Sequence, residues 1–231
     1  MLVGLATSVI GGACVWLWER GKRSRALRRN AGFFGVVPGE TCVIVIGNKY
    51  NRPDTTNRKD VCAIIEVATL ASQLGSDVVT ESSNDFRGSN DARTGYCIGG
   101  PLSDANIRTG GHLAAHLPGV AILPHSEEPE AAAFVVNGHR YLFEKGSLEY
   151  TLVAKFTPPE ATRPVFLICG QSSLANQAAI HYLKRHYRDV ARSLVCVDRF
   201  CILIKVPDIE TYGFQAATLE RDITREAFTR A

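Results

Sequence analysis

Residues 41–47, TCVIVIG, form a continuous apolar run that ends in glycine. Such a run predicts a strand buried on both faces, because a half-exposed strand would alternate apolar and polar residues. The stretch RKDVCAIIEVATLASQLG follows at 58–75, with its apolar residues at helical spacing. Asn57 and Asp60 resemble a capping box at its start, and a second strand is expected at 77–80. This order predicts a parallel strand–helix–strand unit.

The rest of the chain repeats this order with one interruption. Asn137-Gly138 stands between two apolar runs, which is the strongest short-range signal for a hairpin, here over residues 131–144. Strand–helix alternation on both sides of that hairpin predicts a three-layer, Rossmann-like α/β sandwich with a mixed sheet and a β-hairpin insertion. The other expected strands are 94–98, 119–123, 148–157, 164–170 and 199–206, and the other expected helices are 104–116 and 172–188.

The composition is that of one globular domain with an extension: 231 residues, 45% of them hydrophobic, at a mean hydropathy of -0.01. Charge is distributed unevenly along the chain. Residues 1–30 hold six basic side chains against Glu19, whereas the remaining residues hold 20 basic and 22 acidic ones. The globular part therefore lacks the positive field of a nucleic-acid-binding protein. Seven cysteines without a CxxC pair argue against a disulfide framework and against a zinc ribbon.

The first residues have the pattern of a membrane anchor. Residues 1–18, MLVGLATSVIGGACVWLW, carry no charge and would span about 27 Å as a helix. Trp16 and Trp18 stand where an interfacial aromatic belt would fall, and basic residues follow at once. This pattern predicts a single-pass transmembrane helix in the cell membrane, with the following domain in the cytoplasm. A buried core helix or an interfacial segment is the alternative.

Small residues recur every four positions on one face of that expected helix, at Gly4, Ser8 and Gly12. Such spacing is suited to close packing between membrane helices, so a homo-oligomer is one hypothesis; the alternative is that the small residues have no such role, since they are common in membrane helices. The basic residues that follow are also suited to contact anionic lipid headgroups. The expected organisation is a transmembrane helix at 1–18, a basic juxtamembrane segment and linker at 19–40, the α/β domain at 41–207, and a polar tail or surface helix at 208–231.

Three glycine-bearing turns each follow a strand that is expected to be buried. The carboxyl ends of parallel strands share one sheet edge, and ligands of open α/β sheets bind there, where the strand order reverses. Glycine lets backbone amides approach an anion, and a helix N-terminus favours negative charge. Neither G-x-G-x-x-G nor a Walker A motif is present, so ordinary turns remain the alternative. The residues expected to bind a nucleotide-like ligand are Gly47, Asn48, Gly99, Gly100, Asn106, Gly170, Ser172 and Ser173.

An enzyme acting on nucleotides at the same edge would need a carboxylate, and the candidates are Glu66, Glu81 and Asp104. Gly170-Gln171-Ser172 partly matches a nucleophile elbow, but no histidine follows His186 to complete a hydrolase triad. His112 and His116 are four residues apart and could share a metal on one helix face, but without the glutamate of an H-E-x-x-H motif the pair is only a weak signal for a metal site. No metal site is therefore expected, and no cofactor is identified.

The runs VIVIGNK and RKDVCAIIEVATLASQLG, then CIGGPLSDAN, then VFLICGQSSLANQAAIHYL resemble a family of uncharacterised prokaryotic proteins. These membrane-anchored, Rossmann-like proteins pair a GGP-x-x-x-x-N loop after one strand with a glycine-rich loop and an alanine-rich helix after a later strand. The resemblance covers about residues 41–206 and carries no activity. The later loop of the family often contains a Gly-Thr pair that residues 174–179, LANQAA, lack. The architecture is more loosely similar to the sensor and NAD-cleaving domains of bacterial conflict systems.

Three functions follow from these patterns. The leading hypothesis is a membrane-tethered cytosolic module that binds a nucleotide-like ligand and acts in sensing or signalling. The second is an enzyme that hydrolyses N-glycosidic or phosphoester bonds of nucleotides at the same sheet edge. The third is a structural membrane protein that assembles without a ligand.

Overall fold

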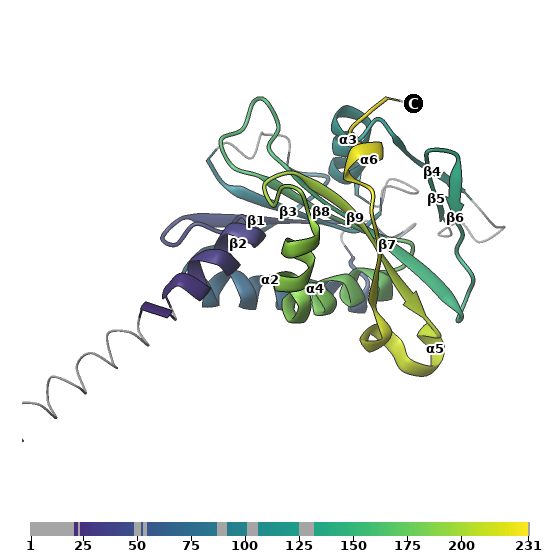
Figure 1. Ribbon diagram of the computed structural model, residues 1–231, viewed down its shortest axis with the longest axis horizontal. Coiled ribbons are helices and arrows are strands. Elements are labelled where there is room, and N and C mark those ends of the chain that lie inside the picture. Colours follow the sequence, from purple (N-terminus) through teal and green to yellow (C-terminus); the bar gives the residue numbers. More distant parts are fainter. Residues whose placement is uncertain are drawn as a thin grey trace, which may run out of the picture.

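The computed structural model describes residues 21–22, 24–48, 52, 55–86, 92–100, 106–124 and 132–230. Their fold is a Rossmann-like α/β arrangement around a mixed seven-stranded sheet (Figure 1). The sheet strands, in spatial order, are β10 (Thr218–Asp222), β9 (Phe200–Pro207), β7 (Leu148–Phe156), β8 (Val165–Gly170), β3 (Thr94–Ile98), β1 (Thr41–Ile46) and β2 (Asp77–Ser82). The helices are α2 (Arg58–Gln73), α3 (Ile107–His116), α4 (Ser173–Ser193), α5 (Ile209–Tyr212), the 3₁₀ helix η2 (Gly213–Ala216) and α6 (Thr224–Ala227).

The direction of the strands decides at which edge of the sheet a ligand can bind. Strands β2, β1, β3 and β8 run parallel to one another, whereas β7 is antiparallel to both of its neighbours, β8 and β9. The chain leaves β1 toward β2 on one side and then crosses to β3 on the other side. The strand order therefore reverses between β1 and β3, which is the topological switch point of an open α/β sheet.

The sheet divides the interior into two cores. Cys42 and Ile44 of β1 pack with α2 and α4 on one face, while Val43 and Val45 pack with α3 on the other. All four of these side chains are essentially inaccessible to solvent. Figure 1 shows α2 and α4 side by side on one face, and α3 and α6 on the opposite face. The prediction that the apolar run at 41–47 is buried on both faces is confirmed.

The expected elements are present with boundaries shifted by a few residues, but one strand belongs elsewhere. The strand expected at 119–123 is β4 (Val120–Pro124), and it pairs with the hairpin strands β5 (Ala132–Val136) and β6 (His139–Tyr141). Asn137 and Gly138 form the hairpin turn with positive φ angles, as expected. These strands make a separate three-stranded sheet instead of extending the main one.

The segment expected to be a linker packs into the domain. Residues 24–34 are helical, and Phe33 and Phe34 are buried against Phe166 at ring-centroid distances of 6.5 and 6.1 Å. The buried Lys155 amine donates to the Gly32 carbonyl at 2.7 Å and to the Val197 carbonyl at 2.9 Å. The expected boundary at residue 41 is thus too late, because the aromatic residues of AGFF supply apolar area to the first core.

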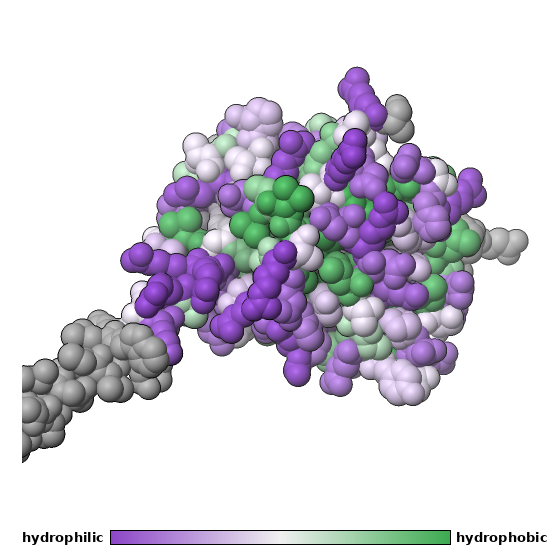
Figure 2. All heavy atoms as spheres, in the orientation of Figure 1, coloured by the Kyte–Doolittle hydropathy of each residue, from purple (hydrophilic) through white to green (hydrophobic). Residues whose placement is uncertain are grey.

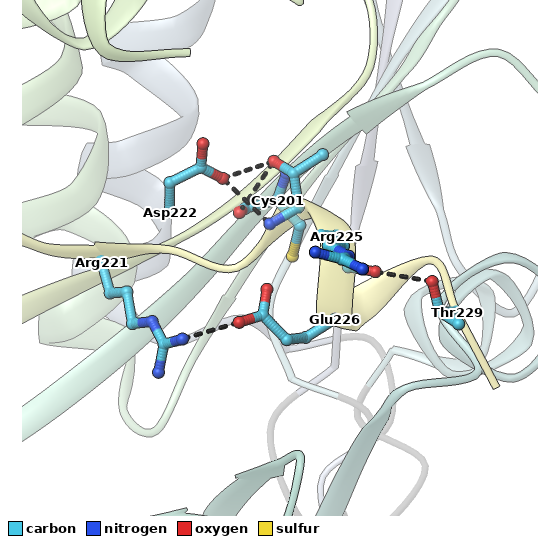
Figure 3. A network of polar contacts seen from close by, with 7 residues as sticks. Cys201, Arg221, Asp222, Arg225, Glu226 and Thr229 are labelled. Atoms are coloured by element: carbon cyan, nitrogen blue, oxygen red, sulfur yellow. Dashed lines mark hydrogen bonds and ion pairs between the residues drawn. The ribbon is translucent and has the colours of Figure 1, made fainter. Parts of the chain in front are cut away.

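The chain after residue 207 also differs from the polar tail that the sequence predicts. Strand β10 pairs antiparallel with β9, and Ile223 and Ala227 are fully buried. Hydrogen bonds hold this end to β9: the Thr224 hydroxyl accepts from the Cys201 amide at 2.9 Å and donates to Asp222 at 2.5 Å. Figure 3 shows Cys201 and Asp222 together with the nearby ion pair of Arg221 and Glu226. The last strand and helix are therefore part of the domain.

Within the described residues, no helix combines the length and apolar character that crossing a membrane requires. The anchor expected at 1–18, with Gly4, Ser8 and Gly12, lies outside those residues.

Candidate functional site

The three glycine-bearing turns meet at one edge of the sheet, as the sequence predicts. Strands β1, β3 and β8 are adjacent and parallel, so their carboxyl ends lie together. The Gly99 amide donates to the Ile168 carbonyl of β8 at 3.0 Å. A Cβ atom placed on Gly100 would lie 3.4 Å from the Gly170 carbonyl oxygen, so these two turns are in close contact. Gly99 has a φ of +112°, a conformation that only glycine adopts without strain.

Asn106 joins the two strands of the switch point to the helix that follows them. Its side chain is fully buried, and its amide donates to the Ile98 carbonyl at 3.0 Å and to the Val45 carbonyl at 3.5 Å. Its side-chain oxygen accepts from the Thr109 amide at 3.0 Å and so caps α3. Asn106 was expected to offer hydrogen bonds to a ligand, but these bonds are made within the protein. Its role in the structure is to hold β1, β3 and α3 together.

Asn176 likewise connects a turn of this edge, the one after β8, to a helix. Its side-chain oxygen accepts from the Gly170 amide at 2.6 Å, and its amide donates to Asp60 of α2 at 2.8 Å. Asn176 and Asp60 are both buried. Asp60 was expected in a capping box with Asn57, but no side-chain capping bond from Asn57 is found among the described residues. Asp60 instead faces α4, and this contact fixes α2 against the turn after β8.

A buried carboxylate that the sequence analysis did not single out lies at the same edge. Glu149 of β7 is 6% exposed and accepts a hydrogen bond from the Ser172 hydroxyl. Ser172 also caps α4 by accepting from the Ala175 amide at 3.2 Å. Burial raises the pKa of Glu149, and the hydrogen bond from Ser172 opposes this effect. The usable signal was the polar residues at three of the four alternate positions 149–155 of β7: Glu149, Thr151 and Lys155 share one face of the strand with Val153.

Three helices begin at this edge, because α2, α3 and α4 each follow one of the parallel strands. Helix N-termini carry unpaired amides and a partial positive charge. Gly47 and Asn48 follow β1, and the Thr56 hydroxyl donates to the Gly47 carbonyl at 3.2 Å just before α2. Ser173 is the first residue of α4. The edge as a whole is suited to a negatively charged group.

The carboxylates proposed for an enzyme are dispersed. Glu66 lies eight residues into α2, about 12 Å from its start, and its carboxylate is 3.3 Å from the Lys184 amine. Glu81 lies opposite Val45 on β2, the outermost strand of the sheet. Asp104 lies outside the described residues. Among the acids of this edge that the structure describes, Glu149 is the one that is both buried and hydrogen-bonded to an expected site residue, Ser172.

His112 and His116 do not form part of this edge. Their rings are 5.6 Å apart and both pack on Phe156 in the second core. Burial lowers the pKa of His112 to about 4, with added repulsion from Arg108 and His116. The described residues contain no group of three or more potential metal-ligating side chains.

The chain matches no protein-family model, no curated protein and no solved structure.

Proposed function

We propose that the domain binds a nucleotide-like anion at the carboxyl edge of β1, β3 and β8 and acts as a ligand-responsive module tethered to the membrane. The observation that carries this proposal is the meeting of the Gly99-Gly100 and Gly170 turns at the switch point, with three helix N-termini around them. Glycine leaves the backbone accessible, and the helix N-termini favour the negative charge of a phosphate.

The surrounding side chains support backbone recognition of the ligand. Asn106 and Asn176 are buried and use their amide groups on carbonyls, backbone amides and Asp60. They keep the turns in one conformation, so the peptide groups are already ordered before a ligand arrives. Such preorganisation reduces the entropy cost of binding. The tether rests on the uncharged run at 1–18 and the basic residues after it.

The test compares two glycine variants of the full-length chain purified in detergent. Small molecules that co-purify with the wild type are identified by mass spectrometry, and binding of ATP and NAD is measured by calorimetry. Gly100→Val should abolish binding, because its side chain would enter the narrow space beside the Gly170 carbonyl. Gly111→Ala on α3, where a Cβ atom meets nothing within 4 Å, should bind like the wild type.

The thermal midpoint of each variant is measured beside binding, so that loss of binding is separated from loss of fold. A folded Gly100→Val variant that still binds would show that the turn contributes nothing to recognition. Wild-type protein that neither co-purifies with a nucleotide nor binds ATP or NAD would favour the assembly function.

Glu149 supports a second candidate, hydrolysis of the bound nucleotide. A buried carboxyl group with a raised pKa beside a hydroxyl is suited to general acid–base chemistry. Glu149→Gln keeps an oxygen that accepts from Ser172 but removes the ionisable group. If the domain is an enzyme, this variant should bind nucleotide and lose turnover. If the domain only binds, wild type and variant should both return the nucleotide unchanged.

A further inference from the structure

A second polar site lies on the other half of α4, away from the carboxyl edge. A cavity of about 300 Å³ opens between α4 and the segment formed by η2 and the start of β10, and it is lined by His181, Tyr182, Arg185, His186, Gln215 and Ala217. Arg185 is thirteen residues after Ser172, about 19 Å along the helix axis. The cavity is therefore separate from the proposed nucleotide edge, and its ligand does not depend on that proposal.

Five of the six lining side chains can donate a hydrogen bond, and none of the six is a carboxylate. All three aromatic rings that line the cavity contact an aromatic neighbour. His181 packs edge-on against Phe214 at 4.9 Å, and Tyr182 stacks on His186 at 4.7 Å. The Arg185 guanidinium has no hydrogen bond or ion pair with another residue in the described part of the chain. A group of fixed donors around an unused guanidinium is complementary to an anion.

The charged side chains around the cavity are mostly positive, which also favours an anion. Helix α4 carries four lysine and arginine side chains between residues 184 and 192 against one acid, Asp189, which is bound to Arg192 at 2.7 Å. The nearby Glu66 carboxylate forms an ion pair with Lys184. Burial lowers the pKa of His181, Glu66 opposes this effect, and the positive charges of Arg185, Lys184 and His186 add to it. The cavity thus lies in a positive field on a domain whose remaining surface is slightly acidic.

The helical segment 24–34 extends this basic face. Its exposed side chains include Arg25, Arg28 and Arg29, and Phe34 at its end lies 5.9 Å from the Tyr187 ring of α4. Figure 2 shows hydrophilic side chains gathered where this segment, purple in Figure 1, joins the domain. Clustered basic residues of this kind concentrate anions, including those of a lipid surface, on the α4 side of the domain.

We infer that the α4–η2 cavity binds a phosphate group, with Arg185 as its main charged contact. A volume of about 300 Å³ lies at the lower end of small-molecule pockets, which suits a phosphate with a small substituent. Arginine can meet two phosphate oxygens at once, and the imidazole, phenol and amide groups can bond the rest. Two sources share this chemistry: a soluble phosphorylated metabolite and the headgroup of an anionic phospholipid.

The experiment uses the full-length chain in phosphatidylcholine nanodiscs, with the histidine side chains followed by NMR. Inorganic phosphate and glycerol 3-phosphate are the soluble probes. They should shift the signals of His181 and His186 in a saturable way. Arg185→Gln should weaken this binding about tenfold or more, because a charge-assisted bidentate contact is lost. Arg188→Gln removes the same charge one turn along α4, outside the cavity lining, and should change affinity less than about twofold.

Nanodiscs that contain phosphatidylglycerol distinguish the source. If a lipid headgroup occupies the cavity, the two histidine signals are already shifted before phosphate is added, and Arg185→Gln restores their original positions. If only a soluble ligand binds, the signals shift with glycerol 3-phosphate and not with the lipid. Equal weakening by Arg185→Gln and Arg188→Gln would mean diffuse charge attraction and would overturn the inference. Absence of any shift with all three probes would overturn it as well.

Discussion

The carboxyl edge of the sheet and the α4–η2 cavity both contain polar side chains. The two regions differ in whether these side chains already form hydrogen bonds within the protein. At the edge, Asn106 and Asn176 are buried and hydrogen-bonded to strands and helices of the protein. At the cavity, Arg185 is exposed and makes no bond to a described residue. The first set holds a backbone in shape, whereas the second set is available to a ligand. Substitution of the two edge asparagines should therefore reduce stability, whereas substitution of Arg185 should reduce affinity.

The largest loss of stability is expected from Gly170→Ala. A Cβ atom there would lie 2.8 Å from both the Asn176 side-chain oxygen and the Ser172 carbonyl, so the turn after β8 must move. Overpacking of this kind costs up to about 3 kcal/mol in the free energy of unfolding. Gly111→Ala is the control and should be neutral or slightly stabilising, because its Cβ meets nothing within 4 Å. Urea denaturation measures both, and equal stability would mean that the edge is not a rigid scaffold.

A smaller loss is expected from Asn176→Ala, which removes the acceptor of the Gly170 amide and one hydrogen bond of Asp60. Loss of a buried polar contact of this type costs about 2 kcal/mol. Gln177→Ala is a close control, since Gln177 is the next residue, is also buried, and has a side-chain oxygen with no hydrogen-bond partner in the described residues. Its truncation should cost clearly less. Comparable losses from the two variants would contradict the network described for the edge.

The packing of each element explains why some parts of the fold could be predicted from the sequence and others could not. Strands such as TCVIVI and VFLICG were predictable, because a strand buried on both faces is apolar throughout. The edge strand TLERD was not, since its exposed, polar pattern is equally typical of a surface tail. The linker prediction failed at Phe33 and Phe34 for the converse reason: the flanking glycines indicated a loop, and the aromatic packing outweighed them.

In the site, the glycine turns were predictable and the side chains that hold them were not. A glycine after an apolar run marks a turn locally, so Gly47, Gly99 and Gly170 could be assigned from their neighbours. Asp60 and Asn176 meet across 116 positions in the chain, and a single sequence contains no information on that pairing. The roles of the two asparagines as internal supports therefore required the coordinates.

Glu149→Gln should change stability in a pH-dependent way. The pKa of Glu149 is raised in the folded protein, so its contribution to stability is greatest below the ordinary value of 4.5 and decreases as pH rises through the folded pKa. The neutral amide of the variant would avoid this penalty while still accepting from Ser172. The variant should be more stable than the wild type at pH 7.5, and this advantage should disappear as the pH falls toward 4. Thermal midpoints across this range measure the difference, and a gain that is independent of pH would contradict the assignment.

Arg185→Gln is expected to have the smallest effect on the unliganded protein. Because the guanidinium is exposed and makes no bond to a described residue, its loss should change the free energy of unfolding by less than about 0.5 kcal/mol. Inorganic phosphate should then make the stability of the wild type and of the variant differ. A ligand that binds only the folded state stabilises it by about 2.7 kcal/mol at one hundred times its dissociation constant. The wild type should gain stability with phosphate and the variant should gain little. A marked loss of stability in Arg185→Gln without phosphate would place Arg185 among the structural side chains, like those of the carboxyl edge, and the distinction between the two regions would fail.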